Sequence, residues 1–256
     1  MQKKNIQSLL NKGYFIIKLD KKYYRELRNF IIKKIDNKNK NFKLNDLHKT
    51  VKISNLNKLR ISLFKSINKN LKFKNNLFNS AEKFIEGCVG SEICSSDVNL
   101  SIQMPNDDTS LLEMHADFFS GESLFQINLW IPFVNVKNTQ SMFIIEPSKS
   151  FEILKKIKND KTINFQKIHK KYSKNFQWLN LKSGEALIFS PNCLHGNTIN
   201  KENKTRISIN IRYKNIFSPY NKTKNEKKIG GFYKMISPKA VTLFNLKHNF
   251  DEIIQK

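Results

Sequence analysis

Phe125-Gln126-Ile127-Asn128-Leu129-Trp130-Ile131-Pro132 is the stretch that decides the fold class of this 256-residue chain. Its apolar side chains alternate with Gln126, Asn128 and Trp130. A period of two is that of a β-strand whose two faces have different surroundings, not that of a helix. Pro132 marks the end of the strand because it cannot donate a ladder hydrogen bond.

The same alternation and the same turn signals recur on both sides of this strand. Residues 98–104 alternate, and short apolar strands are predicted at 141–145, 186–189 and 205–213. Short strands at this frequency are typical of a β-sandwich or a jelly roll. Before them the sequence predicts a strand at 13–19, a helix at 21–35 capped by Asp20, and two further helical stripes at 56–67 and 77–85.

The chain therefore predicts one mainly β domain over residues 1–256, without a linker that would divide it. We expect a helical N-terminal support at about residues 1–90. The β core should occupy about 97–215, and a C-terminal extension should follow at about 216–256.

The net charge of +25 comes from 46 Lys and Arg against 21 Asp and Glu. Only five of these cations are arginines, and the lysines accompany abundant Asn, Ile and Phe along the whole chain. This indicates a general compositional bias and not the local, Arg-rich patch of a nucleic-acid surface. Attraction of anionic substrates remains compatible with the charge.

The sequence has no run of 18 apolar residues, so no membrane span is expected, and its N-terminus lacks the apolar stretch of a signal peptide. The three cysteines, Cys88, Cys94 and Cys193, match no zinc or disulfide framework. We therefore predict a protein of the reducing cytoplasm.

His115-Ala116-Asp117 is a candidate for half of a metal site. In an extended chain an imidazole and a carboxylate two residues apart point to one face, where both can bind one divalent ion. Two histidines and one carboxylate with open positions opposite them are the ligands of non-haem Fe(II) oxygenases. His195, at the end of a predicted strand, is either this third ligand or an ordinary loop histidine.

The strand at 205–213 has one wholly polar face, formed by Arg206, Ser208, Asn210 and Arg212. Such a face either meets water or lines a polar cavity. An arginine in a chain that otherwise uses lysine favours the cavity, because the guanidinium fork suits bidentate capture of a carboxylate. Ser208 could donate a second hydrogen bond to the same carboxylate.

The order His-x-Asp, then His, then Arg eleven residues later within Arg-x-Ser resembles that of the Fe(II)/2-oxoglutarate-dependent oxygenases. Within them, residues 128–133 and 141–148, and Gly13-Tyr14 before the first helix, resemble the phytanoyl-CoA dioxygenase-like branch. Residues 99–105, the His-x-Asp segment with Phe119-Ser120-Gly121, and residues 194–197 and 217–220 look like the oxygenases found sporadically in bacterial surface-carbohydrate gene clusters. The resemblance covers roughly residues 10–250.

This resemblance implies a double-stranded β-helix, that is, a jelly roll of the cupin-like kind. It implies that His115, Asp117 and His195 are catalytic and hold Fe(II), and that Arg206 with Ser208 anchors the far carboxylate of 2-oxoglutarate. Reaction with O₂ would convert this co-substrate into succinate and CO₂. The small-molecule substrate would be a sugar, a nucleotide-sugar or a related metabolite of surface-polysaccharide biosynthesis.

Three further residues are predicted to contact the co-substrate, namely Trp130, Asn128 and Gln103. Trp130 could equally be a core aromatic, and Asn128 and Gln103 could equally face outward. Two other functions stay open: a cupin-like sugar isomerase or epimerase, which would not need the Arg206–Ser208 anchor, and a non-catalytic basic nucleic-acid-binding protein. The sequence does not predict an oligomeric state.

Overall fold

The computed structural model describes residues 3–36, 42–159, 165–221 and 227–248, and helices make up 45% of them. The fold is therefore mixed α/β with antiparallel sheets, and its helices are not confined to the N-terminal support that the sequence predicted. The α-helices are α1 (Lys3–Lys12), α2 (Lys21–Ile35), α3 (Ile53–Lys69), α4 (Leu71–Asn79), α5 (Glu82–Val89), α6 (Pro147–Asn159), α7 (Phe165–Tyr172) and α8 (Ala240–His248). Short 3-10 helices are η1 (Leu44–Lys49), η2 (Asp117–Ser120), η3 (Asn138–Gln140) and η4 (Ser173–Asn175).

The strands form two antiparallel sheets. The major sheet has the order β1-β7-β4-β9-β2-β10, and β3 pairs with β9 beside β2. Its strands are β1 (Tyr14–Lys18), β2 (Ile93–Ser95), β3 (Asn99–Gln103), β4 (Gln126–Pro132), β7 (Glu185–Phe189), β9 (Arg206–Asn215) and β10 (Lys234–Ser237). The minor sheet has the order β6-β5-β8, made of β5 (Phe143–Ile144), β6 (Gln177–Trp178) and β8 (His195–Gly196).

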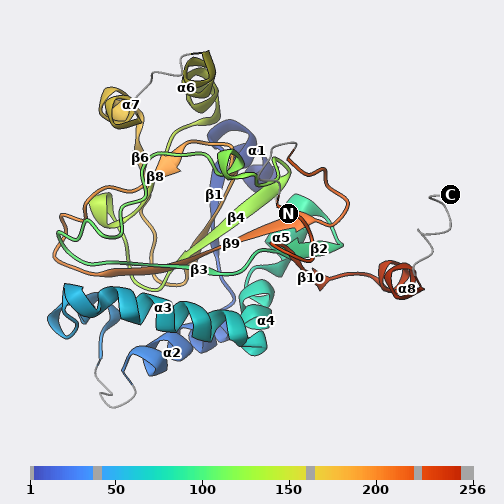
Figure 1. Ribbon diagram of the computed structural model, residues 1–256, viewed down its shortest axis with the longest axis horizontal. Coiled ribbons are helices and arrows are strands. Elements are labelled where there is room, and N and C mark those ends of the chain that lie inside the picture. Colours follow the sequence, from blue (N-terminus) through green and yellow to red (C-terminus); the bar gives the residue numbers. More distant parts are fainter. Residues whose placement is uncertain (1–2, 37–41, 160–164, 222–226, 249–256) are drawn as a thin grey trace.

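The elements are arranged in layers, as Figure 1 shows. Helices α2, α3 and α4 cover one side of the major sheet, and the minor sheet lies on the other side together with α6 and α7. All seven residues of β4 are buried, because this strand lies inside the major sheet and both of its faces are covered. The polar side chains of β4 therefore do not face water.

Most of the predicted elements have the expected type. Asp20 caps α2, and its carboxylate accepts hydrogen bonds from the backbone amides of Lys22 (2.8 Å) and Tyr23 (3.3 Å). The stripe at 77–85 belongs to two helices, because α4 ends at Asn79 and α5 begins at Glu82. Of the strand predicted at 141–145, only β5 forms.

The division of the chain into support, core and extension stays a prediction. In the predicted C-terminal extension the structure places β10, which pairs with β2, and α8, while residues 222–226 and 249–256 lie outside the described ranges. None of the helices in the described ranges is long and apolar enough to cross a membrane.

Candidate metal centre

His115 and Asp117 lie on a short extended segment and not in a regular strand. His115 forms an isolated antiparallel bridge with His195, in which each residue's amide donates to the other's carbonyl, at 3.0 and 2.9 Å. Ala116 is extended, with φ −123° and ψ 134°, and Asp117 opens η2. This single extended residue brings both side chains to one side, and the bridge adds His195 from β8 to them.

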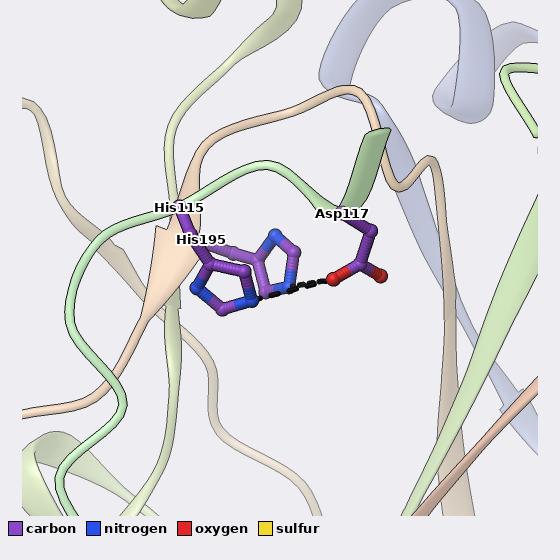
Figure 2. A group of neighbouring side chains, drawn as sticks. All are labelled: His115, Asp117 and His195. Atoms are coloured by element: carbon purple, nitrogen blue, oxygen red, sulfur yellow. Dashed lines mark ion pairs between the residues drawn. The ribbon is translucent and has the colours of Figure 1, made fainter. Parts of the chain in front are cut away.

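The three side chains converge, as Figure 2 shows. One ligand atom from each of His115, Asp117 and His195 lies within 4.8 Å of the others. The Oδ1 atom of Asp117 is 3.3 Å from Nε2 of His115 and 3.8 Å from Nε2 of His195. The Nδ1 atoms are 2.8 Å and 2.9 Å from the carbonyls of Glu113 and Cys193. A carbonyl accepts only, so in each neutral ring Nδ1 carries the proton and Nε2 is free to bind a metal.

The electrostatics of the three residues suit a divalent cation. Burial, reinforced by the charge of His115, lowers the pKa of His195 to about 4, so its ring is neutral. Burial also lowers the pKa of His115, but Asp117 more than offsets this and the net shift is upward. Burial raises the pKa of Asp117, yet the hydrogen bond from His115 and the charges of His195 and Arg212 bring it well below its usual range. The site therefore presents one carboxylate, the neutral imidazole of His195, and the imidazole of His115, whose proton is harder to remove.

Two residues outside the triad hold the Asp117 carboxylate. Asn128, fully buried on β4, donates from its amide to Oδ2, and an Nη of Arg212 lies 3.3 Å from Oδ1. The sequence predicts that Asn128 contacts the co-substrate. The structure places its side chain against the carboxylate of Asp117. Arg212 in turn forms an ion pair with the buried Glu122. Nothing in the sequence pattern indicated Glu122, because its contact depends on the packing of two distant segments.

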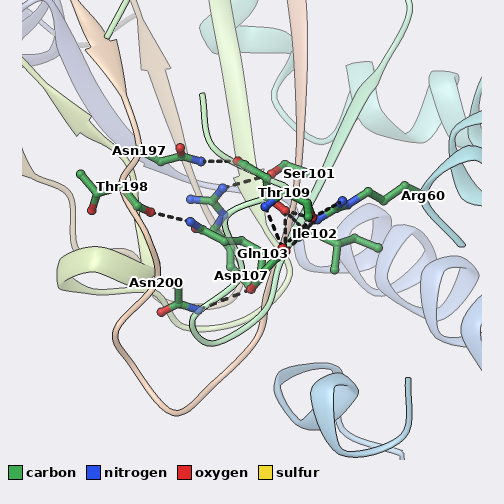
Figure 3. Close-up of polar contacts among 11 residues, drawn as sticks. Arg60, Ser101, Ile102, Gln103, Asp107, Thr109, Asn197, Thr198 and Asn200 are labelled. Atoms are coloured by element: carbon green, nitrogen blue, oxygen red, sulfur yellow. Dashed lines mark hydrogen bonds and ion pairs between the residues drawn. The ribbon is translucent and has the colours of Figure 1, made fainter. Parts of the chain in front are cut away.

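A cavity of about 340 Å³ opens beside the triad. The whole polar face of β9 lines it together with His115, Asp117, His195, Trp130, Asn99, Ser101, Ser120 and Asn197. The polar face of β9 therefore lines a polar cavity. Trp130, which is 5% exposed, forms part of the wall. Gln103 is not among the lining residues: its amide donates to the carbonyl of Thr198 at 2.6 Å (Figure 3).

Arg206 is a buried cation without a carboxylate partner among the described residues. Its side chain is 3% exposed and donates only to the carbonyls of Gln140 and Ser141 and to Oγ of Ser101, at 3.0–3.3 Å. Within the described ranges, its Nε and the Oγ of Ser208 are buried and have no hydrogen-bond partner. Burial lowers the pKa of Arg206 to about 10. Arg60, by contrast, is paired with the buried Asp107 at 2.9 Å (Figure 3).

Comparison with known proteins gives no match to a family model and none to a curated protein. Solved structures do match. The non-heme monooxygenase ThoJ in its apo form has a TM-score of 0.57 at 10% identity, over 97% of this chain and 98% of that one. HygX from Streptomyces hygroscopicus, with nickel and 2-oxoglutarate bound, has 0.53 at 9% identity, over 85% and 88%. The carbocyclase SnoK from nogalamycin biosynthesis, described as non-heme and alpha ketoglutarate dependent, has 0.52 at 12% identity, over 86% and 87%.

Identities this low are evidence of a shared fold and of nothing more. The chain thus has the fold of non-heme, 2-oxoglutarate-dependent oxygenases, with antiparallel sheets matching their double-stranded β-helix. Its own residues add a His-x-Asp…His group that can hold one metal ion.

Proposed function

We propose that this protein is an Fe(II)- and 2-oxoglutarate-dependent oxygenase. His115, Asp117 and His195 would hold the iron on one face, which leaves its other positions open toward the cavity. Bound iron would supply the oxidising chemistry: one oxygen atom of O₂ would enter succinate as 2-oxoglutarate loses CO₂, and the other would be used to oxidise the substrate.

The observation that carries the proposal is Arg206, a buried guanidinium with no anion beside it among the residues that the structure describes. A buried charge without a partner is costly, so such a group indicates that an anionic ligand completes the site. The unpartnered Ser208 hydroxyl lines the same cavity and can donate to the same anion. A dicarboxylate fits these features, because one end can bind the metal while the other pairs with Arg206.

The remaining cavity residues would position the ligands and limit the access of water. Trp130 is an apolar wall between polar neighbours and can pack against the carbon chain of 2-oxoglutarate. Asn128 keeps one oxygen of Asp117 occupied, so that the other faces the metal. Gln103 supports the cavity indirectly, through its hydrogen bond to Thr198.

For the substrate we propose a sugar, a nucleotide-sugar or a related metabolite of surface-polysaccharide biosynthesis. Asn99, Ser120, Asn197 and Asn210 line the cavity with amides and hydroxyls, which suit a hydroxyl-rich molecule. The Oδ1 atom of Asn210 is buried without a partner. The narrower assignment to surface polysaccharides rests on the sequence resemblance of residues 99–105, 194–197 and 217–220.

Replacing Arg206 by methionine tests the proposal. We expect the affinity for 2-oxoglutarate, measured by calorimetry with metal present and O₂ excluded, to fall ~100-fold or more, since a charge-assisted bidentate pair is lost. Metal affinity should persist. The metal-free variant should be at least as stable as the wild type, because an unpaired buried cation has been removed.

Arg60→Met is the matched control. It removes a cation that already has a partner, so it should lower stability by about 3 kcal/mol or more, by leaving Asp107 buried without its cation. Affinity for 2-oxoglutarate should not change. The proposal fails if wild-type protein with metal does not bind 2-oxoglutarate. An isomerase would bind metal but tolerate Arg206→Met, and a nucleic-acid-binding protein would show salt-dependent affinity for DNA or RNA without needing metal.

A further inference from the structure

A line of buried polar side chains connects the candidate ligand Asp117 with the C-terminal part of the chain. Arg212 contacts both Asp117 and Glu122, and Glu122 accepts a hydrogen bond of 2.7 Å from the amide of Gln126. The side-chain oxygen of Gln126, Oε1, accepts a hydrogen bond from the hydroxyl of Tyr233. We call these four residues beyond Asp117 the relay. Each is at most 8% exposed, and Tyr233 is completely buried.

The C-terminal segment also holds the loop that carries Asp117. The side-chain amide of Asn221 donates to the carbonyls of Phe118 and Glu122, at 2.8 and 3.0 Å. The hydroxyl of Ser123 donates to the carbonyl of Pro219 at 2.8 Å. Beyond residues 222–226, the amide of Lys227 donates to the carbonyl of Gly121 at 3.0 Å, so residues on both sides of this range contact residues 118–123, which follow Asp117 directly. These part-buried contacts join the C-terminal segment to the residues next to the candidate ligand.

The charges along the relay explain why its far end should matter to the metal. The guanidinium of Arg212 lies 3.3 Å from the Asp117 oxygen that also faces both histidines. An unbalanced cation there would compete with a metal ion for this oxygen. Glu122 contacts the guanidinium of Arg212 through its carboxyl group and draws it toward itself, although burial and the charge of Asp117 raise the pKa of Glu122 to about 7. Gln126 and Tyr233 fix the position of Glu122. The Nε2 atom of Gln126 donates to Glu122, and the Oε1 atom of Gln126 accepts from Tyr233, so the orientation of the Gln126 amide is set at both ends.

We propose that Glu122, Gln126 and Tyr233 are positioning residues of the metal centre, which act through Arg212 on the orientation and charge of Asp117. The C-terminal segment that carries Tyr233 is then part of the metal site. This inference rests on the proposed function to the extent that His115, Asp117 and His195 bind a metal. It goes beyond that function in assigning a role to residues that do not contact the cavity.

Two substitutions and one matched control test the relay. Glu122→Gln keeps the shape of the side chain and removes its charge, and Tyr233→Phe removes a single hydroxyl. Tyr213→Phe is the control, because Tyr213 is as deeply buried on β9 but its hydroxyl has no hydrogen-bond partner in the part of the chain that the structure describes. For each protein we would measure Co(II) affinity by calorimetry, the visible absorption spectrum of the Co(II) form, and thermal unfolding of the metal-free protein.

We expect Glu122→Gln to weaken Co(II) binding ~10-fold and Tyr233→Phe to weaken it by a smaller factor of about 3, as for residues that orient metal ligands. Both should change the Co(II) spectrum, while Tyr213→Phe matches the wild type. The double variant Glu122→Gln, Tyr233→Phe should lose less than the product of the two factors, since both act through one connection.

Lower thermal stability with unchanged affinity and spectrum in both variants would show a structural role only and overturn the inference. If wild-type protein does bind Co(II), that result leaves the proposed function standing. If wild-type protein does not bind Co(II), the proposed function and the relay fail together. Should Tyr233→Phe not fold, Glu122→Gln decides by the same two readouts.

Discussion

The pKa values of the two candidate histidine ligands shift in opposite directions, although the Nδ1 atom of each ring contacts a backbone carbonyl. His195 is 3% exposed, and burial lowers its pKa to about 4. His115 lies at the edge of the cavity, and its contact with Asp117 outweighs burial and raises its pKa. In the metal-free protein near neutral pH, His195 is therefore neutral while His115 is partly protonated.

This difference predicts the pH dependence of metal binding. A metal displaces protons from its ligands, and only His115 carries one near neutrality. Metal affinity should fall as the pH drops through the raised pKa of His115, with a slope of about one proton per metal. Calorimetric titrations in buffers of different ionisation enthalpy would measure the proton release. A release of two protons would contradict the assignment of His195 as neutral.

The element that organises the site is the contact between β8 and the His115 segment. Gly196 follows His195 on β8, and a Cβ added there would lie 2.8 Å from the carbonyl oxygen of Leu112 and 3.1 Å from that of Glu113. These are backbone atoms, which cannot move aside cheaply. Glycine at this position therefore lets the two segments approach closely enough for the bridge between His115 and His195.

Gly196→Ala should separate the two segments and spread the metal ligands. We expect a loss of about 1–3 kcal/mol in the free energy of unfolding from the steric conflict. Metal affinity, measured by calorimetry, should fall about 10-fold or more. Gly231→Ala is the control, because the nearest atom to its added Cβ is 4.0 Å away and neither property should change. Normal metal binding by Gly196→Ala would show that the bridge does not set the ligand geometry.

At the scale of the whole molecule, the cavity lies where the two sheets and the loop after residue 104 meet. Its lining comes from β3, β4, β7, β8, β9 and η2, which are spread over residues 99–215. A ligand that binds there contacts residues of both sheets at once. Binding should therefore stabilise the entire fold by mass action.

Thermal unfolding should show that 2-oxoglutarate stabilises the protein strongly only when the metal is already bound. With metal bound and O₂ excluded, 2-oxoglutarate at about 100 times its Kd should add ~2.7 kcal/mol. For a domain of this size, that is a rise of about 5–10 °C in Tm. Without metal the increment should be much smaller, and Arg206→Met should lose it while keeping the increment from the metal. Equal stabilisation by 2-oxoglutarate with and without metal would show that it binds away from the triad.

Much of this protein could be read from local sequence. The alternation in β4 and β9, the Asp20 cap and the helical stripes are encoded by neighbouring residues, because periodicity and capping act over a few positions. The chemistry of the candidate ligands is likewise a property of residue type. The polar face of β9 and the types of His115, Asp117, His195 and Arg206 therefore predicted the kind of site.

Only the tertiary structure decided which of these residues meet and what surrounds them. It joined His195 to His115 through a backbone bridge, directed Asn128 to Asp117 and Gln103 to Thr198, and brought Glu122 and Tyr233 into line with Arg212. It also showed that Arg206 is buried without a carboxylate partner among the described residues. These contacts depend on how distant segments pack and which polar groups lose water as they do so, and no short sequence pattern specifies that outcome.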